Sequence, residues 1–201
     1  MFDSYQKTEL ELMLENLYKK HAILSPSDLS IENVAKKLRI NIVYMEGARE
    51  VALWDEDDAV IFLNPNKPKT IMRKIFFHEL CHPLRHYGDQ AGFVDTFITL
   101  QERQANQFML YAAMPFFMIE QLDLPISEEH ISSLLSFTFD VPLQLAKKRV
   151  EQIKRRIQQS LYDNEIKKQQ SNYEKSYDPA NWSTETKKIM NQLYSQLQGA
   201  Q

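Results

Sequence analysis

The sequence predicts an α+β fold, in which a small, mainly antiparallel or mixed sheet packs on helices and is followed by a helical C-terminal part. Short segments rich in β-branched residues are confined to residues 40–64. Apolar residues at helical spacing lie on both sides of that region. The chain has only four glycines and neither of the glycine-rich phosphate loops of nucleotide-binding folds. A length of 201 residues suits one domain, or one domain with an appendage.

Two helices are expected before the sheet. Residues 5–20 place apolar side chains at i, i+3, i+4 and i+7 from Leu10, which is the spacing of one helical face. A second helix begins after Ser30, whose hydroxyl is a suitable N-cap, and its buried stripe starts at Ile31. Because this helix leads straight into β-like sequence, we interpret it as a packing helix rather than as half of a helix-turn-helix.

Three short strands are expected at residues 40–46, 50–54 and 59–64. The last two are joined by the acidic run DEDD at 55–58. We interpret this run as a solvated hairpin tip rather than a cation site, because adjacent residues in a turn do not converge their carboxylates on one ion. The strand at 59–64 is expected to present an edge to which an extended peptide adds.

The second half of the chain is expected to be mainly helical. One helix covers roughly residues 95–113, and the run at 141–162 has the apolar spacing of a long helix. The sequence after it is polar and loosely patterned. We therefore expect a domain at residues 1–120 and a helical C-terminal region with a polar tail at residues 121–201.

Composition limits the classes of protein to consider. The net charge is −3, which argues against a protein that coats nucleic acid. The single cysteine, Cys81, excludes an intramolecular disulfide and suits a reducing compartment. The longest nearly apolar stretch, residues 108–119, is shorter than the ~20 residues that span a bilayer. No secretory signal pattern is present, so we expect a soluble cytoplasmic protein without a membrane partner.

The run FFHELCH at residues 76–82 carries the main candidate site. On a helix, His78 and His82 project from the same face one turn apart, so both can reach one ion. Glu79 lies to the side of such an ion, where it can take a proton from water. The flanking residues are apolar, and two unpaired buried histidines would be costly. A bound Zn²⁺ removes that cost, so the pattern predicts a zinc site.

A catalytic zinc site needs a third protein ligand. Glu102 follows His82 by twenty residues, but spacing alone leaves it equally open as an exposed charge. Asn106 lies one turn later and would hydrogen-bond the free ring nitrogen of a ligand histidine. His86 offers a rival ligand set, but three ligands on one straight helix would extend over more than about 10 Å. We therefore interpret His86 as a nearby polar or substrate-facing group.

HELCH, a spacer of about twenty residues, and then E-x-x-A-N-x-F ending in M-P resemble the ImmA/IrrE family of zinc metallopeptidases. The similarity covers roughly residues 27–118. It implies that His78, His82 and Glu102 are the zinc ligands and that Glu79 is the general base. Two departures from the family pattern affect the motif helix. Cys81 replaces a small residue and is expected to pack in the helix, and Pro83 predicts a kink or a helix end beside His82.

The resemblance also implies a function. Members of that family cleave helix-turn-helix transcriptional repressors of phages, mobile elements or stress regulons, so a protein substrate is expected and nucleic acid is not a direct ligand. In the expected hydrolysis, Glu79 accepts a proton from water and passes it to the leaving amine. The group that stabilises the oxyanion is left open among His86, Arg85, Tyr87 and Tyr44.

The alternative is a regulator without turnover that binds a repressor or DNA. Residues 147–170 hold eight Lys and Arg against three Asp and Glu, and a basic helix can contact phosphates. Apolar residues recur at helical spacing in the same segment, which favours a packing helix with a solvated basic face. DNA binding that is salt-dependent and unaffected by chelators would favour this alternative.

Overall fold

The computed structural model describes residues 2, 4–47, 49–55, 58–86 and 95–198. They form helices around one small sheet, which confirms the predicted α+β class. The elements, in chain order, are α1 (Glu9–Lys20), η1 (Pro26–Leu29), α2 (Ile31–Leu38), β1 (Asn41–Tyr44), β2 (Val51–Trp54), β3 (Ala59–Leu63), α3 (Lys69–Glu79), α4 (Cys81–Arg85), α5 (Asp95–Ala113), α6 (Phe116–Ile119), α7 (Glu128–Thr138), α8 (Leu143–Tyr177), η2 (Pro179–Asn181) and α9 (Thr184–Gln198).

The sheet is mixed and has the strand order β1-β3-β2. β1 pairs with β3 in parallel, and β2 pairs with β3 antiparallel, so that Ile61 faces both Ile42 and Ala52. Alternate residues of β3 are buried, as the pleat requires. The expectation that the strand at 59–64 presents an edge is therefore wrong. β1 takes the free side of β3 through a non-local parallel pairing, and β2 is the edge beside α4.

Side-chain caps define the first helices. Thr8 and Glu11 form a capping box at the start of α1. At the start of α2, the Ser30 hydroxyl accepts a hydrogen bond from the Asn33 amide, which confirms the predicted N-cap. The antiparallel pairing of β2 with β3 is also confirmed, with the Asp58 amide donating to Asp55 Oδ1 at the hairpin connection. Residues 56–57 of the acidic run lie outside the described residues.

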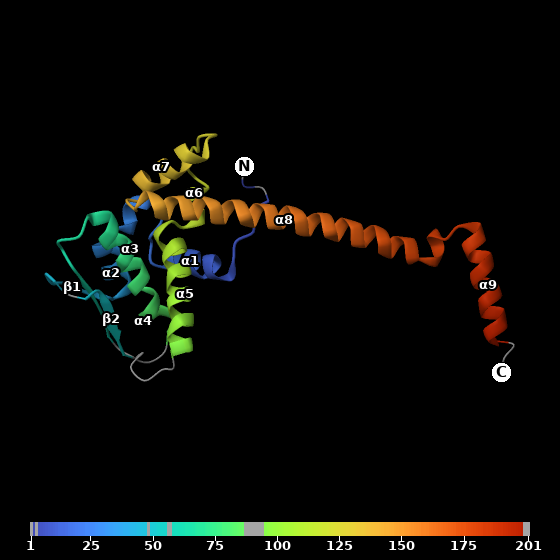
Figure 1. Ribbon diagram of the computed structural model, residues 1–201, viewed down its shortest axis with the longest axis horizontal. Coiled ribbons are helices and arrows are strands. Elements are labelled where there is room, and N and C mark those ends of the chain that lie inside the picture. Colours follow the sequence, from blue (N-terminus) through green and yellow to red (C-terminus); the bar gives the residue numbers. More distant parts are fainter. Residues whose placement is uncertain (1, 3, 48, 56–57, 87–94, 199–201) are drawn as a thin grey trace.

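The helix that carries the motif packs in the centre of the body. In Figure 1, α3 and α4 lie between the sheet and α5. Phe76 and Phe77 of α3 and Phe108 of α5 are fully buried. α5 packs against both α3 and α4, and its Ala105 is also fully buried. This packing brings Glu102 of α5 to His78 and Gln104 of α5 to His86.

The core does not divide at residue 120. Leu145, Ala146 and Val150 of α8 are buried in the same hydrophobic cluster as residues of α1 and α5. Residues on both sides of position 120 therefore contribute to one buried cluster, because the apolar face of α8 packs on the body. Only the later part of α8 and α9 extend away from the body (Figure 1).

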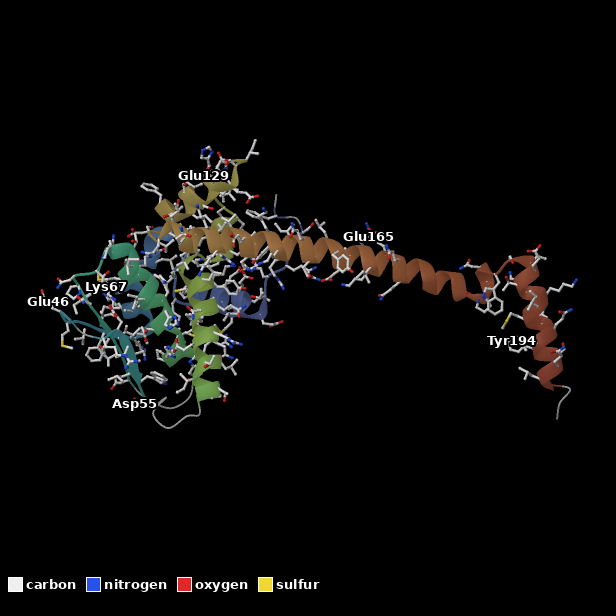
Figure 2. All side chains as sticks on the ribbon, in the orientation of Figure 1. Glu46, Asp55, Lys67, Glu129, Glu165 and Tyr194 are labelled. Atoms are coloured by element: carbon white, nitrogen blue, oxygen red, sulfur yellow. The ribbon has the colours of Figure 1, made fainter. Side chains whose placement is uncertain are left out.

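That extension is dominated by solvent-exposed side chains. Figure 2 shows them around the distal part of α8, where Glu165 is labelled, and around α9, where Tyr194 is labelled. Tyr194 is 51% exposed and Ile189 on the same helix is 64% exposed. Within the described ranges, none of the helices combines the length and the apolar character that a membrane span requires.

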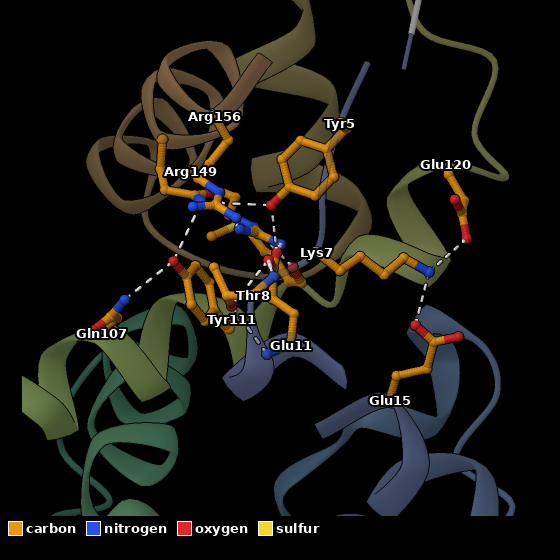
Figure 3. A network of polar contacts seen from close by, with 12 residues as sticks. Tyr5, Lys7, Thr8, Glu11, Glu15, Gln107, Tyr111, Glu120, Arg149 and Arg156 are labelled. Atoms are coloured by element: carbon orange, nitrogen blue, oxygen red, sulfur yellow. Dashed lines mark hydrogen bonds and ion pairs between the residues drawn. The ribbon is translucent and has the colours of Figure 1, made fainter. Parts of the chain in front are cut away.

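A polar network ties α8 to the N-terminal helix (Figure 3). Arg149 is fully buried, and its Nη2 lies 2.7 Å from Glu11 Oε1. Its Nε donates to the carbonyl oxygen of Met114 at 3.1 Å. Glu11 also accepts from the Tyr5 hydroxyl and from the Thr8 amide. One of the basic residues in the segment 147–170 is thus a structural ion-pair partner inside the core.

Candidate metal centre

Two helices in succession position the motif. α3 ends at Glu79 and α4 begins at Cys81, with Leu80 between them in helical geometry. Pro83 has no amide hydrogen, so the Glu79 carbonyl lacks its donor four residues ahead, and the helix is interrupted there. The interruption was expected beside His82 but lies at Leu80, and His82 remains inside α4. His78 and His82 still face the same side, toward α5.

The structure brings His78, His82 and Glu102 together. His78 Nε2 lies 3.1 Å from Glu102 Oε2, and His82 Nε2 lies 3.7 Å from Glu102 Oε1. One ligand atom from each of the three residues lies within 4.8 Å of the others. Four-coordinate Zn²⁺ with bonds of ~2.0–2.2 Å holds its donor atoms roughly 3.3 Å apart. The donor set therefore fits a single metal ion after a small contraction.

The environment of His82 favours its neutral form. Only 4% of the residue is exposed. Burial, and secondarily the neighbouring His86, lowers the pKa of His82 to about 4. The Trp54 ring from β2 stacks on the His82 ring, with centroids 5.7 Å apart. A neutral imidazole has a free lone pair for a metal, so His82 is ready to act as a ligand at neutral pH.

Glu79 is held beside this cluster by the sheet. The backbone amide of Ala52 in β2 donates to Glu79 Oε2 at 2.9 Å. Burial raises the pKa of Glu79 to about 7, against the Ala52 hydrogen bond, and the charges of Glu102 and Glu50 act in the same direction as burial. A carboxyl group with a pKa near neutrality can both accept and release a proton under physiological conditions.

The His86 ring lies between His82 and Gln104, a position that the sequence did not specify. It is 8% exposed, its Nδ1 lies 3.0 Å from His82 Nδ1, and its Nε2 lies 3.1 Å from Gln104 Oε1. The interpretation of His86 as a polar group near His82 agrees with this arrangement. Its spacing four residues after His82 is the signal that could have identified it as a neighbour of that ring.

Asn106 does not take the place expected for it. Its side chain is exposed, and its Nδ2 donates to the backbone carbonyl of Glu102 at 2.8 Å. A short polar side chain on a helix surface readily bonds the carbonyl of the preceding turn, which turns it away from the cluster. His86, rather than Asn106, is the partner of the His82 ring nitrogen.

The other candidate groups make no hydrogen bond to His78, His82 or Glu102 in the contacts described, or they lie outside the described residues. Cys81 is buried, and burial raises the pKa of its thiol to about 12, so it packs in the helix as expected. The Tyr44 hydroxyl donates to Glu32 on α2 at 2.7 Å, and Arg85 is exposed. Tyr87 lies outside the described residues. The residue that stabilises an oxyanion stays open.

The family of the chain is shown by comparison with known proteins. Residues 35–151 match the model of the Peptidase M78 family, described as the IrrE N-terminal-like domain. The chain belongs to this family. The matched IrrE N-terminal-like region contains the three clustered residues and Glu79, and it continues past residue 120, as the core does. Membership makes this a metallopeptidase-type protein.

Two relatives come from Bacillus subtilis (strain 168). The chain is 32% identical over 149 residues to the phage-like element PBSX protein XkdA, which covers 74% of this chain and 75% of that protein. It is 30% identical over 162 residues to the uncharacterized protein YqaB, which covers 81% of this chain and 94% of that protein. The IrrE N-terminal-like chain thus resembles both relatives over most of its length.

Proposed function

We propose that this protein is a zinc-dependent endopeptidase that cleaves a helix-turn-helix transcriptional repressor. The observation that carries the proposal is the approach of His78, His82 and Glu102, whose ligand atoms lie within 4.8 Å of one another. Glu79 lies next in sequence to one of them and is held by the amide of Ala52. Membership in a metallopeptidase family supports the same reading of these residues.

The donor chemistry fits zinc. Two imidazole nitrogens and one carboxylate oxygen are a typical ligand set of catalytic zinc, which keeps a further coordination position for water or substrate. His78, His82 and Glu102 would hold the ion. When bound, zinc acts as a Lewis acid that polarises a carbonyl group and lowers the pKa of water. Burial is the main cause of the raised pKa of Glu79, and the negative charges of Glu102 and Glu50, which act in the same direction, also favour a cation at this place.

Glu79 carries the proton transfers. One carboxylate oxygen accepts a proton from the attacking water while the water oxygen forms a bond to the scissile carbonyl carbon. Glu79 then gives the proton to the leaving nitrogen as the carbon–nitrogen bond breaks. The Ala52 amide fixes the other carboxylate oxygen, so the side chain keeps one orientation through both transfers.

An extended substrate segment would lie along β2. This strand is an edge of the sheet, and its residues Ala52 and Trp54 contact Glu79 and His82. Edge strands bind extended peptides through main-chain hydrogen bonds. A repressor is the proposed substrate because the motifs resemble the ImmA/IrrE peptidases and because one relative is named as a protein of a phage-like element.

The first test is the metal content of the purified protein. We expect about one zinc per chain in the wild type and little in His82→Ala and Glu102→Ala, with circular dichroism confirming that the variants fold. Asn106→Ala is the matched control on α5 and should keep its zinc. A folded wild type without zinc, even after zinc is supplied, would rule out the proposed mechanism.

The second test is cleavage. A purified helix-turn-helix repressor is incubated with the wild type, with Glu79→Gln and with chelator-treated protein, and the products are identified by mass spectrometry. We expect cleavage by the zinc-loaded wild type only, while Glu79→Gln still binds zinc. Salt-dependent DNA binding that is insensitive to chelators, without cleavage, would favour a binding regulator instead.

A further inference from the structure

We propose that His86 and Gln104 are positioning residues that set the tautomer and the orientation of the His82 ring. This inference rests on the proposed function, since it concerns how His82 presents its metal-binding nitrogen. His82 has Nε2 directed to Glu102 and Nδ1 directed to His86. His86 has its other ring nitrogen directed to Gln104. The three side chains therefore form one hydrogen-bonded relay that ends at a metal ligand.

The direction of the relay follows from counting protons. A neutral imidazole carries one N–H, and a nitrogen that binds a metal must be free of it. If His82 Nε2 binds the metal, its proton is on Nδ1 and is donated to His86 Nδ1, 3.0 Å away. His86 must then carry its own proton on Nε2, which donates to Gln104 Oε1 at 3.1 Å.

With its Oε1 facing His86 Nε2, Gln104 favours one of the two directions. Its carbonyl oxygen can only accept, so it selects His86 protonated on Nε2 and, through His86, His82 protonated on Nδ1. If the amide were turned to present its NH₂ group, both rings would take the opposite tautomer and His82 Nε2 would carry a proton. A hydrogen-bond acceptor at this position is therefore needed for metal binding two side chains away.

The relay is held rigidly on both sides. The His86 amide donates to the His82 carbonyl at 2.9 Å, and the His86 carbonyl accepts from Trp54 Nε1 at 3.1 Å. The Trp54 ring also stacks on His82, with an interplanar angle of 22°. His82 and His86 are both buried, so bulk water cannot readily replace a lost partner.

The same contacts argue against His86 as a metal ligand. Its two ring nitrogens face His82 and Gln104, and neither faces Glu102 in the contacts described. Such partners of ligand histidines commonly change metal affinity by 10- to 100-fold when they are removed. We expect an effect of that size for the relay.

The experiment compares two substitutions of Gln104 that differ in hydrogen bonding. Gln104→Leu removes the acceptor, whereas Gln104→Glu keeps an acceptor of similar size. Zinc affinity is measured by competition with a chromogenic chelator, with circular dichroism as the check on folding. We expect Gln104→Leu and His86→Ala to weaken zinc binding about 10- to 100-fold, and Gln104→Glu to bind at least as tightly as the wild type.

The visible absorption of the Co²⁺-substituted protein gives a second readout. We expect Gln104→Leu and His86→Ala to change the d–d bands, because the His82 ring loses its fixed orientation, while Gln104→Glu keeps four-coordinate bands of similar intensity. Equal loss of affinity in Gln104→Leu and Gln104→Glu would overturn the relay and indicate a packing role. So would unchanged affinity in both His86→Ala and Gln104→Leu.

The two proposals fail in different ways. If the wild type binds no zinc or Co²⁺, the metallopeptidase proposal itself is wrong. If the wild type binds zinc and loses it in His82→Ala, but not in His86→Ala or Gln104→Leu, only the relay is wrong.

Discussion

The Glu11–Arg149 network and the His78–His82–Glu102 cluster are both polar groups between helices of one body, but the network is buried, whereas the Glu102 side chain of the cluster is 43% exposed. In the network, a carboxylate faces a guanidinium at 2.7 Å, and Thr8 and Tyr5 donate to the same carboxylate. In the cluster, two imidazoles meet a carboxylate, and the second carboxylate, Glu79, lies alongside. The charges of Glu11 and Arg149 cancel, whereas the cluster has imidazole lone pairs and negative charge that no side chain of the cluster cancels.

This difference separates a structural role from a functional one. Buried polar groups cost free energy unless they are satisfied, and the chain itself satisfies the Glu11–Arg149 pair. The cluster offers donor atoms that suit an added cation. Burial of polar residues alone therefore does not identify a metal site. An excess of negative charge that the chain does not compensate does identify one.

The largest effect is expected from breaking the network. Arg149→Met leaves Glu11 buried without its cation and should lower the free energy of unfolding by about 3–5 kcal/mol, measured by urea denaturation. The double variant Glu11→Leu/Arg149→Met should recover most of that loss. Arg155→Met, at an exposed position of the same helix, should change stability by less than ~0.5 kcal/mol. A cost below ~1 kcal/mol for Arg149→Met would contradict the structural role.

Zinc should stabilise the cluster but not the network. At free zinc 100 times the Kd, the wild type should gain about 2.7 kcal/mol of unfolding free energy. Because His82 is a proposed ligand, His82→Ala should gain almost nothing, whereas Arg149→Met should keep the increment on its lower baseline. Thermal or urea unfolding with and without zinc measures both. An equal gain in all three proteins would place the bound zinc elsewhere.

Acid should weaken the network. Burial alone would raise the pKa of Glu11, but the Arg149 charge and the hydrogen bonds from Thr8 and Tyr5 outweigh it and hold the pKa below its ordinary value. The stabilisation is present above the ordinary carboxyl pKa and is lost as pH falls through the lowered folded-state pKa. Urea midpoints measured from pH 6 downward should fall more steeply in the wild type than in Glu11→Leu/Arg149→Met.

Glu79 should behave in the opposite way in the metal-free protein. Its folded-state pKa is raised to about 7, so folding favours the protonated form and stability falls as pH rises from the ordinary carboxyl pKa to about 7. Glu79→Gln removes that cost and should be more stable than the wild type at pH 8 by about 1 kcal/mol, allowing for solvent screening of a partly exposed group. No gain in stability at pH 8 would mean that the pKa of the Glu79 carboxyl group is not raised in the folded protein.

The smallest effect is expected at Asn106. Its side chain is exposed and bonds only the carbonyl of the preceding turn in the contacts described. Asn106→Ala should change the free energy of unfolding by less than ~0.5 kcal/mol and leave zinc affinity within twofold of the wild type. A tenfold loss of zinc affinity would restore the role that the sequence first suggested for it.

The features that the sequence predicted correctly depend on patterns of neighbouring residues. The i, i+4 spacing of His78 and His82 and the position of Glu79 follow from helix geometry, which extends over a single turn. The capped start of α2, the β2–β3 hairpin and the helical second half follow from patterns of similarly short range. The motifs also predicted the family, since they are contiguous in sequence.

Contacts between distant elements were not predictable in the same way. The central position of β3 depends on a parallel pairing with β1, and the continuous core across residue 120 depends on α8 packing on the body. Spacing left Glu102 undecided and suggested Asn106 as a partner of a ligand histidine, whereas it did not single out Gln104. Only the packing of α5 against α3 and α4 decided which of these side chains reach the histidines.

The sequence by itself determined the chemistry available to this protein: two histidines and a glutamate on one helical turn, in a chain of α+β type. The tertiary structure decided which distant residues complete the cluster and which complete the relay. The physical reason is that helical spacing is set by backbone hydrogen bonds over four residues, whereas the approach of Glu102 and Gln104 depends on how whole helices pack.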